Sequence, residues 1–110
     1  METIIVKIGR KYSFVNTDEI RWIESDKGYL RIVVEDNYYI VRMTLKEIIK
    51  KLDSVKFTRI SRSKIINIFK IKEVIDSENA NEFIVVLNDS TVLKWGRRYR
   101  NNFPGFPIFK

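Results

Sequence analysis

The sequence predicts a mainly antiparallel β domain, and three observations favour this fold class. Short runs rich in β-branched and aromatic residues recur along the chain at regular spacing. Residues that form turns separate these runs. The 110 residues, 45% of them apolar, are enough to bury a core without disulfides, and the chain has no Cys with which to form any. We therefore expect a single domain over residues 1–110.

The runs that predict strands lie in both halves of the chain. In the first half they cover residues 3–8, 12–15, 20–24, 29–35 and 38–42, and in the second half residues 57–60, 71–75, 83–87 and 91–95. Gly28, Asp36-Asn37 and Asn88-Asp89-Ser90 are turn formers that lie between consecutive runs, so each is expected to join a hairpin. Residues 83–87 are apolar at every position, which predicts a strand covered on both faces.

One segment predicts a helix instead. Thr44 followed three residues later by Glu47 forms a capping box, in which each side chain satisfies an amide at the helix start. An apolar stripe of about two helical turns then follows, formed by Leu45, Ile48, Ile49 and Leu52. The lysines outside this stripe, Lys46, Lys50 and Lys51, are expected on a solvated face.

Single helical turns are expected at three further places. They cover residues 17–19, 61–67 and 97–103, the last ending before Pro104 because proline disfavours a helical conformation in the residue before it. Residues 104–110 are expected to form an irregular tail.

The basic residues are unevenly distributed. The chain has 21 Lys and Arg against 14 Asp and Glu, a formal net charge of +7. Two windows, residues 56–72 and 94–100, hold ten of these basic residues and no acidic one. Because such windows lack the local opposite charges that a merely solvated face would use, they indicate an anionic partner.

The composition argues against an enzyme. Without His and Cys, the usual general base, thiolate nucleophiles and the commonest metal ligands are missing. The Ser61-x-x-Lys64 spacing lacks the companion motifs of acyl-transfer enzymes, and the acidic pairs at residues 18–19 and 35–36 lie at predicted turns. There is no metal-ligand spacing and no phosphate-cradling glycine loop, so we expect no cofactor and no metal.

Double-stranded DNA is the favoured anionic partner. The exposed glycine-and-aromatic motif of common RNA-binding sheets is missing, since Tyr38 and Tyr39 would point to opposite faces of a strand. Binding to an anionic membrane normally needs a longer amphipathic helix than the one predicted here. RNA binding and anionic-surface binding remain the alternatives, and the absence of a signal pattern or a membrane-spanning run predicts a cytoplasmic protein.

The basic windows also resemble a known family. Residues 57–67, F-T-R-I-S-R-S-K-I-I-N, are similar to the F-x-R-I-H-R-S-x-I-V-N signature of the LytTR-type DNA-binding domain of bacterial response regulators. The segments D-E-I-R-W-I-E-S at 18–25, T-L-K-E at 44–47, I-K-E-V-I at 71–75 and R-R-Y-R at 97–100 continue the resemblance in the same order. Two positions differ, because Ser61 replaces the signature His and Gly96 replaces a Ser.

The resemblance implies an elongated all-β fold of several antiparallel sheets, with one short helix, whose loops enter the DNA grooves. By position, it places Tyr29, Arg62 and Arg98 at base edges. Residues expected to contact phosphates are Lys27, Arg59, Ser61, Ser63, Lys64, Asn67, Arg97 and Arg100, and Asn67 equally suits a buried structural amide. It further implies transcription regulation within a two-component system, an N-terminal receiver domain in a longer parent chain and a second copy on repeated half-sites.

Overall fold

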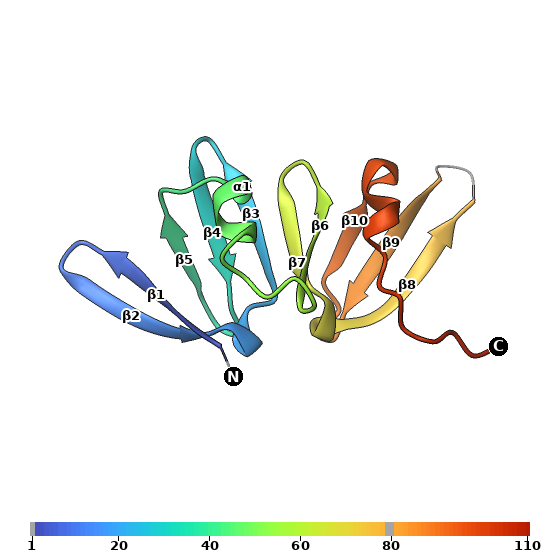
Figure 1. Cartoon of the computed structure of the whole chain (residues 1–110), viewed down its shortest axis with the longest axis horizontal. Coiled ribbons are helices and arrows are strands. Elements are labelled where there is room, and N and C mark those ends of the chain that lie inside the picture. The colour runs from blue at the N-terminus through green and yellow to red at the C-terminus, as the bar shows by residue number, and fades with distance from the viewer. Residues whose placement is uncertain (1, 79–80) are drawn as a thin grey trace.

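The fold consists of antiparallel sheets placed side by side along the longest axis of the molecule (Figure 1). The computed structural model describes residues 2–78 and 81–110, and the molecule measures 50 × 29 × 24 Å. The strands are β1 (Thr3–Ile8), β2 (Lys11–Asn16), β3 (Trp22–Asp26), β4 (Tyr29–Val33), β5 (Tyr38–Val41), β6 (Phe57–Ser61), β7 (Lys64–Asn67), β8 (Ile71–Ser77), β9 (Glu82–Leu87) and β10 (Val92–Trp95). The elongated, mainly β fold predicted from the sequence is confirmed.

Three sheets make up this arrangement. β1 and β2 form a two-stranded sheet, a five-stranded sheet has the order β5-β4-β3-β7-β6, and a three-stranded sheet has the order β10-β9-β8. Every strand pair is antiparallel. Within the described residues, no helix is long and apolar enough to cross a membrane.

The predicted hairpin turns are present. Asp26 pairs with Tyr29 in the β3–β4 ladder, which leaves Lys27 and Gly28 as a two-residue turn. Both have positive φ angles, 49° and 86°, as a tight hairpin turn with the right-handed twist of its strands requires. The turns at residues 36–37 and 88–90 likewise join antiparallel neighbours.

The helical turn predicted at residues 61–67 is wrong, because this segment forms a hairpin. β6 ends at Ser61, β7 begins at Lys64, and Arg62 and Ser63 form the tip. Ile65 belongs to one core and Ile66 to the other, so both faces of β7 are covered by apolar residues, as the alternating side-chain directions of a strand allow. The helical turn lies just beyond, as a 3-10 turn at Ile68–Lys70 (η2).

The helix α1 (Leu45–Ile49) begins with the predicted capping box but is shorter than two turns. The Thr44 hydroxyl accepts a hydrogen bond from the Glu47 amide at 3.1 Å, and the Glu47 carboxylate accepts one from the Thr44 amide at 3.3 Å. Leu45 and Ile48 are buried, as is Leu52 beyond the helix end. The predicted turns at Thr17–Glu19 (η1) and Arg97–Asn102 (η3) are present, and residues 104–110 have no regular structure.

Two apolar cores hold the sheets together. The first lies where β1, β2 and α1 cover one face of the five-stranded sheet, and Leu30 and Ile32 belong to it. The second lies between β6, β7 and the three-stranded sheet around Trp95, which is fully buried and donates from Nε1 to the Tyr99 carbonyl oxygen at 2.7 Å. Only one face of β9 is fully buried, which corrects the prediction that both are.

Candidate nucleic-acid interface

The two basic windows meet at one edge of the molecule. The Gly96 amide, just before η3, donates to the Ile60 carbonyl oxygen at 2.8 Å. The Asn102 side chain donates to the Arg59 carbonyl oxygen at 2.9 Å, so both ends of η3 are fastened to β6. Arg62 and Arg98, 36 positions apart in the sequence, therefore lie in the same region of the surface.

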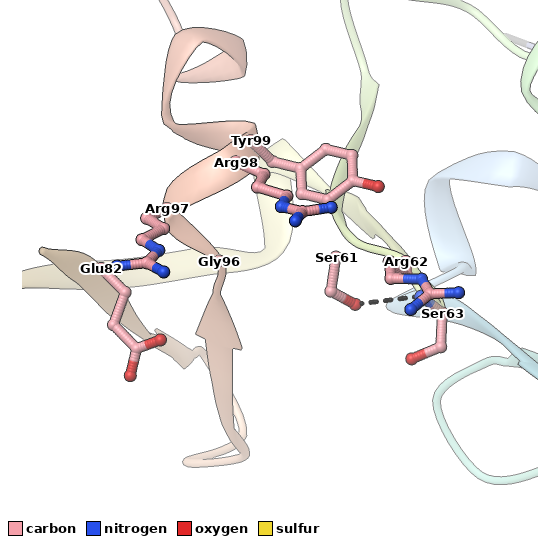
Figure 2. Close-up of a pocket in the computed structure, with 8 residues that line it drawn as sticks. All are labelled: Ser61, Arg62, Ser63, Glu82, Gly96, Arg97, Arg98 and Tyr99. Atoms are coloured by element: carbon pink, nitrogen blue, oxygen red, sulfur yellow. Dashed lines mark hydrogen bonds between the residues drawn. The ribbon is translucent and has the colours of Figure 1, made fainter. Parts of the chain in front are cut away.

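A hollow of about 500 Å³ separates these segments (Figure 2). It is lined by Ser61, Arg62, Ser63, Glu82, Gly96, Arg97, Arg98 and Tyr99. Arg62, Arg97 and Arg98 are exposed, and in the described part of the chain none of their guanidinium groups has a hydrogen bond or ion pair. The hollow therefore presents three free guanidinium groups to solvent, beside two serine side chains.

The tip that carries Arg62 is held in place by Arg59. Arg59 donates from Nε to the Ser61 carbonyl oxygen at 3.1 Å and from Nη2 to the Arg62 carbonyl oxygen at 2.6 Å. The Ser61 hydroxyl oxygen also accepts from the Ser63 amide at 3.2 Å (Figure 2). The guanidinium carbon of Arg59 lies 5.8 Å from the centroid of the Tyr99 ring, so it also touches the η3 side of the hollow.

The β3–β4 turn lies on the same edge as the β6–β7 tip and η3 (Figure 1). Tyr29 is 43% exposed there, and its hydroxyl oxygen accepts a hydrogen bond from Nη2 of Arg42 at 3.3 Å. A second hollow of about 300 Å³ joins this turn to Arg62 through residues at the start of α1. The three segments that the sequence singled out are thus brought together, with α1 between two of them.

Several other basic residues are paired with acids from distant parts of the chain. Lys56 pairs with Asp18, Lys70 with Glu35 at 2.7 Å, and Arg100 with Asp76 at 3.3 Å. The hydrogen bond from Lys56 lowers the pKa of the Asp18 carboxyl, and that from Lys70, followed by that from Arg21, lowers the pKa of Glu35. The acid-free windows therefore do not consist only of unpaired cations.

Comparison with known proteins decides the family. The family model described as the LytTr DNA-binding domain matches residues 10–105 of this chain. The chain belongs to the LytTr DNA-binding domain family. This match covers all three segments at the edge, so the basic edge belongs to the matched domain.

A curated relative and a solved structure agree with this assignment. The Sensory transduction protein LytT of Bacillus subtilis (strain 168) is 27% identical over 96 residues, which are 87% of this chain and 39% of the relative. The chain therefore spans about two-fifths of that relative. The LytTr DNA-binding domain of a putative methyl-accepting/DNA response regulator from Bacillus cereus has the same fold, with a TM-score of 0.81, 17% identity and 94% coverage of each chain.

Asn67 lies in the core of this LytTr domain and not in its basic edge. It is 1% exposed, its Nδ2 donates to the Ile20 carbonyl oxygen at 2.7 Å, and its Oδ1 accepts from the Phe69 amide at 3.0 Å. Because these bonds use both ends of the buried amide, the prediction that Asn67 contacts a phosphate is wrong, and its alternative structural role is confirmed.

Two basic residues near this edge of the LytTr domain were not predicted as site residues from the sequence. Arg42 is opposite Tyr29 across the β4–β5 ladder, and Lys46 lines the hollow beside α1. The β4–β5 hairpin was a partial signal for Arg42, because it brings the chain after β5 beside the start of β4. The observed register pairs Leu30 with Val41, so it is centred between residues 35 and 36 and not on the predicted 36–37, and this places Arg42 beside Tyr29. For Lys46 there was no comparable signal, since its position depends on where α1 packs.

Proposed function

We propose that this LytTr domain binds double-stranded DNA sequence-specifically, as the output domain of a bacterial transcription regulator. Binding in the cytoplasm, without catalysis, is the activity proposed for residues 1–110. The observation that supports it best is that Arg62 and Arg98 line one hollow and that, in the described part of the chain, neither is paired with an acid, although Glu82 also lines this hollow. An Arg guanidinium donates two parallel hydrogen bonds to guanine, which makes it the commonest specific contact in the major groove.

The residues at the edge divide into two roles. Tyr29, Arg62 and Arg98 stand at the three tips and are proposed to read base edges. Residues beside them are proposed to position the duplex through its phosphates, namely Lys27, Ser61, Ser63, Lys64 and Arg97, with Arg59 and Arg100 acting mainly through the protein contacts that they already make.

The length of the molecule suits contact with more than one groove. Its longest axis is 50 Å, whereas one turn of B-DNA rises about 34 Å. The β3–β4 turn, the β6–β7 tip and η3 follow one another along this axis (Figure 1), so they are proposed to contact neighbouring parts of the duplex on one side. A receiver domain joined to the N-terminal side in a longer parent chain, and a second copy bound to a repeated half-site, belong to the same proposal.

Selection from a random duplex pool tests this function. We expect an enriched motif, and we expect the Arg62→Ala/Arg98→Ala double variant to lose that enrichment while its urea unfolding midpoint stays close to that of the wild type. Single-stranded RNA and anionic vesicles serve as competitors in the same binding assay. Displacement of the duplex by either competitor at equal charge concentration contradicts the proposal and favours RNA binding or anionic-surface binding.

A further inference from the structure

The hollow of about 300 Å³ beside α1 has the composition of an anion site. It lies between the β3–β4 turn and the β6–β7 tip, and the described residues that line it include no Asp or Glu. Its basic side chains are those of Lys46, Arg59 and Arg62, and Tyr29 stands at its rim. An acid-free concavity with several cations raises the local concentration of an anionic group.

Lys46 is the basic residue of this hollow that is both free to bind and not already proposed to read a base, as Arg62 is. Arg59 is committed to the carbonyl oxygens of the β6–β7 tip, and Arg62 extends from the tip itself. The Lys46 side chain is exposed on the first turn of α1, and in the described part of the chain its ammonium group has no hydrogen bond or ion pair. A flexible, strongly hydrated ammonium of this kind suits a phosphate as a point charge.

The attraction comes from side chains and not from the helix start. The Thr44 hydroxyl and the Glu47 carboxylate already satisfy the amides of Glu47 and Thr44 in the capping box. The Glu47 carboxylate also accepts from the Thr44 hydroxyl at 2.9 Å, so the acid closest along the helix is held in the cap. Lys46 is therefore the group at this helix that an anion in the hollow would meet.

We propose that this hollow binds a phosphodiester of the DNA backbone through Lys46, between the contacts made by Tyr29 and Arg62. This inference rests on the proposed function, and it makes α1 a fourth contacting segment. It also reverses the expectation that Lys46 belongs to a merely solvated face. Lys50, at the other end of the same helix, is exposed and does not line the hollow.

The salt dependence of DNA binding tests the proposal, with Lys46→Gln as the variant and Lys50→Gln as its matched control. The plot of log affinity against log salt has a negative slope, and one lost phosphate contact makes it less steep by about one unit. We expect this loss for Lys46→Gln on selected and on random duplex, no change for Lys50→Gln, and recovery of the slope in Lys46→Arg. Urea unfolding midpoints close to that of the wild type exclude misfolding as the cause.

A duplex carrying single methylphosphonate linkages supplies the second measurement, because each linkage removes one phosphate charge. We expect one position at which the neutral linkage weakens the wild type but not Lys46→Gln. The proposal is overturned if Lys46→Gln leaves the salt dependence of the affinity unchanged. It is also overturned if the variant loses only the sequence preference at one base pair. If the wild type binds duplex and Arg98→Ala weakens that binding, the proposed function stands whatever Lys46 does; if the wild type does not bind duplex at all, the proposed function fails first.

Discussion

The guanidinium of Arg59 donates to the carbonyl oxygen of Arg62 at 2.6 Å, across the tip of the β6–β7 hairpin. A second bond from Arg59 reaches the Ser61 carbonyl oxygen at 3.1 Å. The two arginines of one sequence motif therefore differ in their surroundings, because Arg59 is committed to the backbone whereas the Arg62 side chain is free. We propose that Arg59 positions Arg62 for its contact with DNA.

Replacing Arg59 by Lys keeps the charge but removes the planar group that reaches two carbonyl oxygens. Hydrogen bonds to a charged group contribute about 1.5–3 kcal/mol when buried, and this one is only half-buried. We expect Arg59→Lys to lower the free energy of unfolding by about 1 kcal/mol and to weaken binding to the selected site about tenfold. Urea unfolding and a binding titration measure both. An unchanged affinity would remove Arg59 from the positioning of Arg62.

Arg98 is proposed to read a base edge from η3. We expect Arg98→Ala to cost about 1–3 kcal/mol on the selected site and to relax the preference at one base pair. Competition titrations with every single-base variant of the site check this prediction. Equal losses on selected and random duplex would assign Arg98 to the backbone.

Lys64, at the start of β7, is proposed to contact a phosphate. Lys64→Ala should weaken binding to all sequences alike and lower the salt slope by about one unit, because one counterion-releasing contact is lost. The measurement is the affinity for one duplex over a range of salt concentrations. A slope equal to that of the wild type would place Lys64 outside the interface.

Asn67 should affect stability and not DNA contact. In Asn67→Ala the buried Ile20 carbonyl oxygen and the part-buried Phe69 amide lose their partner; an unsatisfied buried group costs about 1–3 kcal/mol, and a part-buried one costs less. We expect the free energy of unfolding to fall by about 2–4 kcal/mol, with an unchanged salt slope for the fraction that remains folded. A reduced slope at unchanged stability would contradict the structural role.

Glu35 makes stability depend on acid pH. The bond from Lys70, then that from Arg21, lowers the pKa of the folded carboxyl below its ordinary value of 4.5. Ionised Glu35 therefore stabilises the fold above about pH 4.5, and this stabilisation is lost as the pH falls through the lower folded pKa. Urea midpoints measured across this range should fall less steeply in Glu35→Gln than in the wild type.

Asp36→Asn is the control for this prediction, because Asp36 is the exposed neighbour of Glu35 and, in the described part of the chain, has no ion pair. Its acid dependence should match that of the wild type. If the urea midpoint falls equally steeply with pH in Glu35→Gln and in the wild type, the pair with Lys70 makes no contribution to folding.

The ion pairs around Glu35 also connect two sheets. Arg21 pairs with Glu35 and with Asp89 in the β9–β10 turn, so this cluster joins the five-stranded and three-stranded sheets.

Local patterns in the sequence were sufficient for much of the fold. The Thr44–Glu47 capping box, the Lys27-Gly28 turn and most strands depend on neighbouring residues, so they could be predicted from spacing and residue type. β7 was missed because its four residues, one basic, two apolar and one amide, do not alternate between apolar and polar, and a short run of this kind does not distinguish a strand from a turn of helix. As a strand it pairs with β6 in the hairpin and also with β3, which begins 42 residues earlier.

Residue type and spacing were enough to predict the fold class, the family motifs and the acid-free basic windows. Which basic residues are free of ion pairs could be seen only in the folded chain, because these pairs form between residues far apart in the sequence. Lys56 meets Asp18 across 38 positions and Lys70 meets Glu35 across 35, whereas Arg62 and Arg98 meet an open hollow. Strand register and the packing of α1 determine which of these side chains come close together. Both depend on contacts between distant segments that no local sequence pattern contains.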